Sequence, residues 1–402
     1  MKAVVVGAGF AGLAAAARLL AAGVEVDVFE ARDRVGGRVW SVPFAGAVVE
    51  RGAEFILPGH ETVFATARRL GLRLVRKGTL YGDRDPRGGE PVTLEQVQEG
   101  LERIAADPAR AAGAGTVADA LARYELPPGV SEAIRARVEV TCGCPADALD
   151  ASVLDDTGVA FGPYDTFTLE GGNDGIARGL AAELGDRVHL ASPVRRVAWS
   201  EDGVRLRAGS HVAVANAAVL AVPGTLLSAI TFAPQLPDEK LAAIAHTAYG
   251  QAAKLFVALR TPAPPSQTLS VPGRWWCWTQ LDAEGQPLPF VAAFAGTSRA
   301  LEDLAVAAGP ERWLSELRDL RPDLDLDGET AMVSTWQDDP WARAAYSATS
   351  PRYGAEPELW TAPAGALAFA GEHTAGDWHA LMEGALRSGE RAAQQLLQSA
   401  GR

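Results

Sequence analysis

Residues 3–38 read AVVVGAGFAGLAAAARLLAAGVEVDVFEARDRVGGR and decide the fold of this 402-residue chain. The run opens with three valines, residues 4–6, which are typical of a buried parallel strand. Glycines at 7, 9 and 12 then form G-x-G-x-x-G, and the alanine- and leucine-rich run from Leu13 to about Ala22 predicts a helix. Gly23 ends that helix, and residues 24–29 predict a second strand that stops at Glu30.

Each part of this strand–turn–helix–strand unit matches what a dinucleotide needs. Gly7 permits the tight turn, Gly9 lets the backbone approach a pyrophosphate, and Gly12 lets helix and strand pack closely. The helix N-terminus then faces the phosphates. Glu30 follows about 20 residues after the glycines, where a carboxylate accepts hydrogen bonds from ribose hydroxyls. The unit therefore predicts a dinucleotide-binding site at the start of the chain.

The continuation of the stretch narrows the cofactor. Gly36, Gly37 and Arg38 bring a second set of backbone N–H groups and a guanidinium to the same pyrophosphate, which a nicotinamide enzyme does not need. The segment EARDRVGGR closely resembles the N-terminal signature of the flavin-containing amine oxidase family, which includes monoamine, polyamine and L-amino-acid oxidases. The resemblance implies that FAD is the cofactor.

Composition bounds the class of protein. The net charge is 37 − 50 = −13, which argues against nucleic acid or an anionic membrane surface as a partner. The chain starts a strand within three residues, without room for a targeting segment, and no run is apolar enough to span a membrane. Cys142, Cys144 and Cys277 suggest free thiols in a reducing compartment rather than a metal site or a disulfide framework. We therefore expect a cytoplasmic protein without a metal; a homodimer is one option for its oligomeric state.

The resemblance extends to further blocks and implies more cofactor contacts. Residues 46–57 look like a strand, a glycine turn and a strand, and the family brings this backbone next to the flavin ring. Glu170–Gly175 resembles the turn at which the chain returns to the flavin domain, and the backbone of Val194 is expected against the adenine. The implied FAD-binding residues are Gly7, Gly9, Ala11, Gly12, Glu30, Ala31, Arg32, Gly37, Arg38, Gly52, Ala53, Glu54, Val194, Trp336, Gly371, Glu372, Met382 and Ala385.

Lys254 is the first of three candidate catalytic residues. It lies inside the apolar strand pattern of residues 249–260, and the pattern alone favours an edge or surface lysine. The family places a lysine on such a strand, hydrogen-bonded through water to the flavin N5. A cation there stabilises negative charge that forms on reduced flavin or on oxygen species.

Tyr346 and Leu381 are the other two. Tyr346 matches one wall of the family's aromatic cage in front of the flavin, whereas the position of the second cage tyrosine holds Leu381. We therefore expect a wider, apolar slot that favours a bulky amine. Ala345 stands where the animal monoamine oxidases have a flavin-linked cysteine, so the FAD is expected to be non-covalent. The tryptophans of residues 275–278 are consistent with either core or cavity.

The predicted fold is α/β: a Rossmann-like FAD-binding domain of the glutathione-reductase type with an interleaved α+β substrate domain. We expect residues 1–77, 168–240 and 343–402 to form the first, and residues 78–167 and 241–342 the second. The resemblance covers the cofactor half well and the substrate half poorly.

The predicted function is oxidation of an amine. A hydride passes to the flavin N5, the imine product is released, and O2 reoxidises the flavin to give hydrogen peroxide. The absence of a second nucleotide fingerprint argues against an NADPH-fed enzyme, although single-fingerprint hydroxylases stay open. The alternatives are a desaturase of a non-amine, a flavin-binding protein without turnover, and an L-amino-acid oxidase. The last needs a cavity arginine, for which Arg84, Arg274 and Arg343 are candidates.

Overall fold

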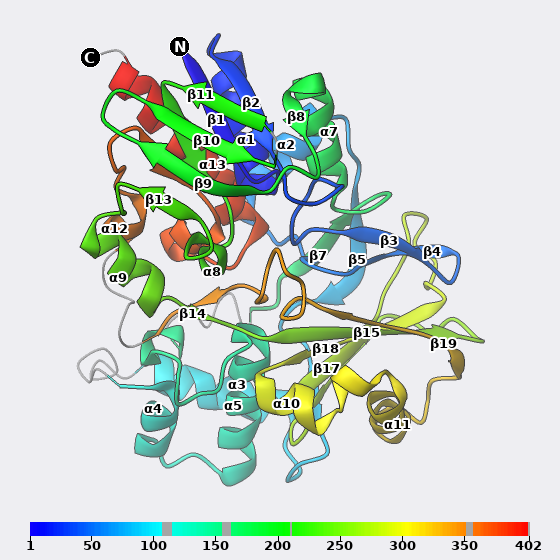
Figure 1. The fold of residues 1–402 in the computed structure, drawn as a ribbon. Helices are drawn as coiled ribbons and strands as arrows, with labels where there is room; N and C mark the ends of the chain where they lie inside the picture. The colour runs from blue at the N-terminus through cyan, green and yellow to red at the C-terminus, as the bar shows by residue number, and fades with distance from the viewer. Residues whose placement is uncertain (107–114, 155–161, 210, 351–356, 401–402) are drawn as a thin grey trace.

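The computed structural model describes residues 1–106, 115–154, 162–209, 211–350 and 357–400. They form a mixed α/β fold organised around two large sheets, which occupy the upper and lower halves of the molecule in Figure 1. Strands from distant parts of the sequence meet in each sheet, so the chain passes between the two halves several times.

The upper sheet is parallel and has five strands in the order β21-β12-β1-β2-β8. These are β1 (Lys2–Val6), β2 (Glu25–Phe29), β8 (Val188–His189), β12 (Ala217–Leu220) and β21 (Leu367–Phe369). Because β1 is central, alternate residues are buried on opposite faces. Ala3 and Val5 pack against α1 (Phe10–Ala21), α7 (Gly175–Leu184) and α13 (Met382–Ala400).

The opposite face of this sheet is covered by more β-structure. Val4 and Val6 pack against a four-stranded sheet with the order β11-β10-β9-β13. Its strands are β9 (Val194–Trp199), β10 (Val204–Ala208), β11 (His211–Ala215) and β13 (Thr231–Ala233). Short helices lie nearby: α8 (Gly224–Leu227), α9 (Asp238–His246) and α12 (Pro357–Thr361). The resulting helix–sheet–sheet layers fix the carboxyl ends of β1 and β2 at one edge.

The lower sheet has six strands in the order β19-β15-β18-β17-β16-β6. They are β6 (Asp85–Arg87), β15 (Ala252–Leu259), β16 (Ser266–Ser270), β17 (Trp275–Thr279), β18 (Phe290–Gly296) and β19 (Leu326–Thr335), with only the β16–β6 pair parallel. One face packs on α3 (Leu94–Ala105), α4 (Val117–Arg123) and α5 (Pro128–Cys142). The other packs on α10 (Ser298–Asp303) and α11 (Glu311–Leu320).

Two small antiparallel sheets lie between the halves. β5 (Leu74–Leu80) pairs with β7 (Asp165–Leu169), and β14 (Ala248–Tyr249) pairs with β20 (Ser347–Ala348). The predicted domain boundaries near residues 77 and 168 thus fall inside β5 and β7. The helix α2 (Glu61–Arg69) precedes this connection.

Residues 46–57 differ from the expected strand–turn–strand. β4 (Ala47–Glu50) forms an antiparallel hairpin with the preceding strand β3 (Ser41–Phe44), and residues 51–55 form no strand. The reason is that the backbone here bonds to the preceding segment, with N–H groups of Arg51 and Ala53 donating to the carbonyls of Trp40 and Arg38 at 2.8 and 3.1 Å. Only Ile56 forms an isolated bridge, to Phe167.

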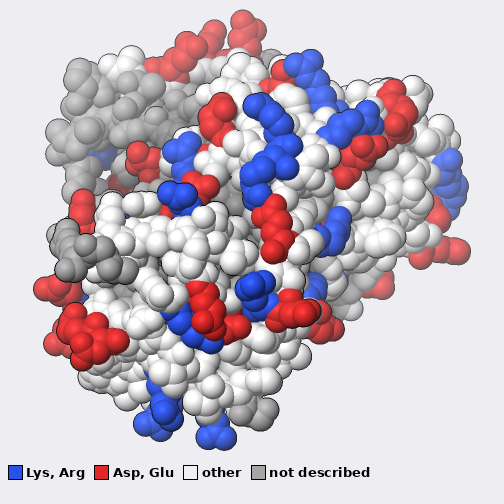
Figure 2. Space-filling model, turned by 90° about the horizontal axis from the view of Figure 1, so that it is seen from above, with Lys and Arg blue, Asp and Glu red and all other residues white. Residues whose placement is uncertain are grey.

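The surface charge and the character of the helices concern binding to nucleic acid and to membranes. On the face seen in Figure 2, acidic and basic side chains are interspersed rather than segregated by sign. Within the described parts of the chain, no helix combines the length and the apolar character that crossing a bilayer requires.

We predict that Gly389→Val destabilises the fold by about 1–3 kcal/mol, because the new side chain overpacks the contact between α13 and α1. A Cβ on Gly389 would stand 2.1 Å from the Ala11 carbonyl oxygen and 3.0 Å from the Ala14 Cβ. Urea denaturation measures the change. Gln398→Val, at an exposed position of the same helix, is the control for helix propensity; equal losses in both variants would contradict close packing as the cause.

Candidate functional site

The three glycines of the turn after β1 and the first turn of α1 have different surroundings. Gly7 has φ +102°, and a Cβ there would stand 2.7 Å from the Ala221 carbonyl oxygen. A Cβ on Gly12 would stand 1.8 Å from the Gly7 carbonyl oxygen. A Cβ on Gly9 would have no described atom within 4 Å. Gly7 and Gly12 are therefore required by the fold itself, whereas Gly9 borders open space.

Glu30 is held rigidly at the end of β2. Its carboxylate accepts the backbone N–H of Ala8 at 2.7 Å and that of Arg32 at 2.9 Å. The side chain is buried, and the turn after β1 is thereby tied to the turn after β2. This geometry leaves an acidic group beside the Gly9 space, as a ribose-binding carboxylate requires.

The second glycine pair lies against the first turn. Gly36 donates its N–H to the Ala8 carbonyl at 2.9 Å, and a Cβ on Gly37 would stand 3.3 Å from the Cα of Gly9. Arg38 donates to Glu372 at 3.0 Å and to the Ala345 carbonyl. The N-terminus of α1, two glycine turns and a guanidinium thus converge on one place, and this donor set fits a pyrophosphate.

Two adjoining cavities contain nearly all the predicted site residues. A cavity of about 110 Å³ follows the two turns. It is lined by Gly7, Gly9, Ala11, Glu30, Ala31, Arg32, Gly37, Arg38, Val194, Gly371, Glu372 and Ala385. A cavity of about 1070 Å³ extends from there between the two sheets. Its lining includes Gly52, Ala53, Glu54, Lys254, Trp336, Tyr346, Leu381 and Met382.

Phe10, Arg38, Glu372 and Ala385 line both cavities, so the two are neighbours along one path. Gly12 lines neither, because it lies behind the turn against Gly7. An elongated molecule with a phosphate-bearing end and a flat ring end fits this arrangement.

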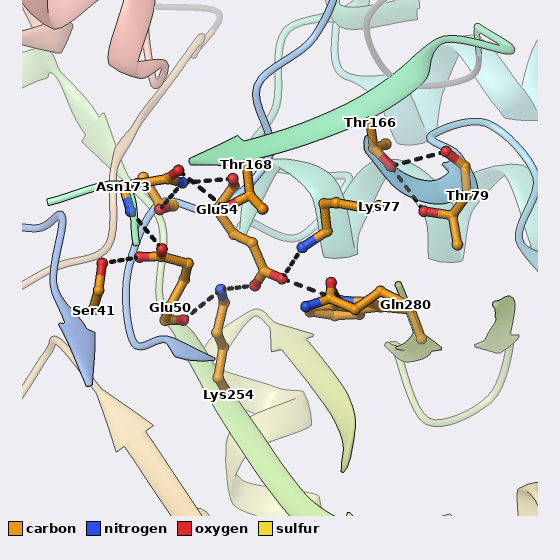
Figure 3. A network of polar contacts seen from close by, with 12 residues as sticks. Ser41, Glu50, Glu54, Lys77, Thr79, Thr166, Thr168, Asn173, Lys254 and Gln280 are labelled. Atoms are coloured by element: carbon orange, nitrogen blue, oxygen red, sulfur yellow. Dashed lines mark hydrogen bonds and ion pairs between the residues drawn. The ribbon is translucent and has the colours of Figure 1, made fainter. Parts of the chain in front are cut away.

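Lys254 is buried within the larger cavity's wall rather than on a surface. It lies on β15, an interior strand between β19 and β18, and only 6% of the residue is exposed. Its ammonium donates to the carboxylate of Glu54 at 2.5 Å and to the Glu50 carbonyl at 2.8 Å. Figure 3 shows that Lys254 and Lys77 approach the Glu54 carboxylate from different sides.

Glu54 therefore joins two buried cations. Lys77, which is 1% exposed, donates to the other oxygen of Glu54 at 2.5 Å, and the Trp278 indole N–H donates to that oxygen at 3.2 Å. Burial opposes ionisation of Glu54, but Lys254 and Lys77 hold its pKa below the ordinary value. Burial also lowers the pKa of Lys77, and Glu54 opposes that change. The Glu54 side chain acts here as a counter-ion, not as a free base.

Glu50 is a second buried carboxyl beside this cluster. Burial raises its pKa to about 7, against the effect of hydrogen bonds from the Asn173 N–H at 2.7 Å and the Ser41 hydroxyl at 2.8 Å. When Glu50 is protonated, the two lysines and Glu54 carry a net charge of about +1. The cavity wall at Lys254 is then electropositive.

The tryptophans of β17 divide between core and cavity, because successive side chains of a strand point to opposite faces. Trp276 and Trp278 line the cavity with ring centroids 4.3 Å apart. Trp275 points the other way and packs on Trp313. Tyr346 lies in the same cavity and donates its hydroxyl to the Thr141 carbonyl at 2.6 Å.

The segment before α13 supplies another wall. Leu381 lines the cavity, and so do Trp378 and His379. His379 lies 3.3 Å from the Thr349 hydroxyl, and the Arg387 guanidinium lies 4.5 Å from the Trp378 ring centre. The aliphatic side chain of Leu381 is thus accompanied by two aromatic rings that the sequence could not place.

Sequence reasoning did not identify Lys77 or Tyr81 as site residues, and it mentioned Arg84 only as one of three arginines. All three come from β5 or the turn after it. The sequence LVRKGTL of residues 74–80 carries no apolar alternation that marks these positions. Only the structure shows that Val75, Lys77 and Thr79 are buried on one face of β5, where a charged residue needs a partner.

Comparison with known proteins agrees with this geometry. The family model described as flavin containing amine oxidoreductase matches residues 10–139 and 140–397. A putrescine oxidase of Kocuria rosea is 30% identical, with 98% of this chain and 94% of the relative covered. An L-amino-acid oxidase of Mus musculus is 26% identical over 98% of this chain and 70% of its own length. The solved cyclohexylamine oxidase from Brevibacterium oxydans IH-35A has the same fold, with a TM-score of 0.85 at 22% identity, covering 100% of this chain and 99% of that one.

We predict that Gly9→Val folds but loses FAD. The backbone of Gly9, with φ −74° and ψ 179°, accommodates valine, and the added Cβ meets no protein atom, so it fills only the space that a pyrophosphate would approach. Calorimetric titration of the apoprotein with FAD measures the loss. Gly12→Val is the matched contrast, because its Cβ collides with the Gly7 carbonyl and should impair folding. Undiminished FAD affinity in Gly9→Val would contradict this placement of the pyrophosphate.

Proposed function

The chain belongs to the flavin-containing amine oxidoreductase family, and from this premise we propose that it oxidises the carbon–nitrogen bond of an amine held in the larger cavity. The single observation that carries the proposal is the path from the glycine turns to an aromatic cavity whose wall contains Lys254 and Tyr346. A cofactor bound along this path would meet a substrate at the aromatic end.

We assign the parallel sheet and its glycine turns to a Rossmann-like FAD domain of the glutathione-reductase type. Gly9, Glu30 and Arg38 would hold the dinucleotide end, and the backbone of Gly52 and Ala53 would lie beside the ring. When bound, FAD supplies the acceptor for the hydride that leaves the amine's α-carbon. Ala345 has no nucleophilic side chain, so the protein holds FAD without a covalent bond at that position.

The protein's own groups position the amine and exclude water. The ring of Tyr346 and the side chain of Leu381 would border the slot in which the nitrogen and its α-carbon lie. Lys254 presents an ammonium to the same space, where it stabilises negative charge as electrons arrive. The amine must enter neutral, and its proton leaves to solvent, because Glu54 is already shared by two lysines. The oxidised product is an imine, which water hydrolyses.

We further propose that dioxygen is the final electron acceptor and is reduced to hydrogen peroxide. A desaturase of a non-amine, the main alternative from the sequence, is disfavoured because the family match covers both the cofactor and the substrate halves of the chain. A cytoplasmic location and a homodimer stay predictions.

The direct test measures hydrogen peroxide released by the purified holoenzyme with a panel of primary, secondary and cyclic amines and amino acids. Release with at least one of them, and FAD recovered intact after acid or heat denaturation, are the expected results. Flavin that stays with the denatured chain would overturn the non-covalent assignment, and turnover of no panel member would overturn the amine assignment.

We predict that Lys254→Met retains FAD but slows flavin reoxidation by O2 about tenfold or more, which corresponds to ~1.4 kcal/mol of barrier per decade. Stopped-flow absorbance measures the rate. The control is Lys240→Met: Lys240 is also buried, but it donates to the carbonyls of Trp360 and Ala362 at 3.0 and 2.9 Å and does not line the cavity. Reoxidation at the wild-type rate in Lys254→Met would reduce Lys254 to a structural role.

We predict that the wild type has a higher kcat/KM for a bulky secondary amine than for benzylamine, and that Leu381→Tyr shifts this preference toward benzylamine. The reason is that a tyrosine ring would narrow the slot opposite Tyr346 and add a second π face. Tyr346→Phe, which keeps the ring, is the control and should cost little. A wild type that prefers benzylamine, or a preference that Leu381→Tyr leaves unchanged, would contradict the proposal that Leu381 widens the slot opposite Tyr346.

A further inference from the structure

Three arginines line the larger cavity. Among the described residues, Arg51 and Arg84 form no ion pair, and only Arg84 of the three has buried guanidinium nitrogens without a hydrogen-bond partner. Arg38 is paired with Glu372, and Arg51 donates to the Ser334 hydroxyl at 3.2 Å. Arg84 is only 3% exposed, and its Nε and Nη1 atoms are buried without a hydrogen-bond partner. No carboxylate in the described parts of the chain forms an ion pair with Arg84.

The Arg84 guanidinium is nevertheless held in one place. Its Cζ lies 3.4 Å from the ring centre of Trp276 and 4.8 Å from that of Tyr81. Trp276 is itself stacked on Trp278, and all four residues lie in or beside the cavity. Stacking on aromatic faces leaves the edge of a guanidinium, which carries its N–H donors, free to bind a planar anion.

The register of the lower sheet places this group relative to Lys254. Lys254 pairs with Phe294 across β15 and β18, and Phe294 pairs with Trp276 across β18 and β17. Paired residues point to the same face, so these three form one row along the cavity, with about 10 Å between the outer Cα atoms. Arg84 therefore lies over the same cavity floor as Lys254, two strands away.

An unpaired buried guanidinium is costly, and the cavity would be more stable without it. Burial lowers the pKa of Arg84 to about 10, with Tyr81 acting in the opposite direction, so the group is still charged at neutral pH. Such a charge repels the distant ammonium of a diamine and attracts an anion. The feature is explained if the missing counter-ion arrives with the substrate.

We propose that Arg84 binds a carboxylate of the substrate, so that the substrate class is an amine that carries a carboxylate, rather than a simple monoamine or a diamine. This inference rests on the amine oxidation proposed above and specifies its substrate. The other two arginines of the sequence do not serve: Arg274 is paired with Glu132 and Glu139, and Arg343 is exposed.

The first test compares three substrates with one skeleton. 2-Phenylethylamine has no carboxylate, L-phenylalanine has one on the α-carbon, and 4-(2-aminoethyl)benzoate has one at the far end of the ring. We expect the wild-type holoenzyme to have a higher kcat/KM for one of the two carboxylate-bearing amines than for 2-phenylethylamine. Which of the two is preferred reports the distance from Arg84 to the reacting carbon.

Arg84→Met should lower the kcat/KM of the preferred carboxylate-bearing amine about 30-fold or more, mainly through KM, and should change that of 2-phenylethylamine less than about threefold. Arg84→Lys should restore part of the loss, because it keeps the charge without the planar fork. Arg321→Met is the matched control: Arg321 is 4% exposed, is paired with Asp323, and does not line the cavity. It should lose stability and keep the wild-type selectivity.

A second test is independent of turnover. Calorimetric titration with phenylacetate and with its neutral isostere phenylacetamide should show weaker binding of phenylacetate alone in Arg84→Met. The melting temperature of ligand-free Arg84→Met should hold or rise, because an uncompensated buried charge has been removed.

The outcomes separate the two proposals. If the wild type oxidises none of the three amines but binds phenylacetate through Arg84, the proposed oxidation fails and the carboxylate site stands. If the wild type prefers 2-phenylethylamine, or if Arg84→Met lowers stability and leaves the substrate ratio and phenylacetate binding unchanged, Arg84 is a packing residue and the inference is overturned.

Discussion

The carboxylate of Glu54, shared between Lys77 and Lys254, is the interaction on which the cavity depends. Its three members come from β5, from the segment after β4 and from β15, so one buried ion cluster ties together three separate parts of the chain. Two ammonium groups without the carboxylate would repel each other in a water-poor interior, and the carboxylate alone would be desolvated without compensation. The cluster is stable only as a whole, and it presents one net positive charge to the cavity when Glu50 is neutral.

The sign of the charge inside the cavity contrasts with that of the molecule. The chain carries a formal net charge of −13, yet the lining of the larger cavity has four basic side chains (Arg38, Arg51, Arg84 and Lys254) against three acidic ones (Glu54, Glu372 and Asp377). Charges on the surface are screened within about 8–10 Å at physiological ionic strength, whereas buried groups act on a ligand at contact. The net charge therefore says little about the ligand, and the identity of the few buried cations says much more.

The alternation of side chains along its strands lets the six-stranded lower sheet form core on one face and cavity wall on the other. On β15, Ala253, Leu255 and Val257 form the core with α10 and α11, while Lys254 points to the opposite face. On β17 the same alternation sends Trp275 to the core and Trp276 and Trp278 to the cavity. A shift of register by one residue would exchange core and site, so the packing of α10 and α11 also protects the orientation of the cavity groups.

The sequence by itself determined the unit of β1, the glycine turn, α1 and β2, and with it Glu30, because all of these follow from local pattern and from the backbone freedom of glycine. It also indicated Lys254, Tyr346 and Leu381, although only through resemblance to a family. Only the tertiary structure decided that Lys254 shares Glu54 with Lys77, that the tryptophans of β17 divide between core and cavity, and that Arg84 alone of three candidate arginines lies unpaired in that cavity. These facts depend on which distant strands pair and in which register, and on which charges find partners across the chain. Pairings of this kind leave no local signature. The residues next to an arginine in the sequence do not reveal whether it is buried or which carboxylate it meets, because distant segments supply both.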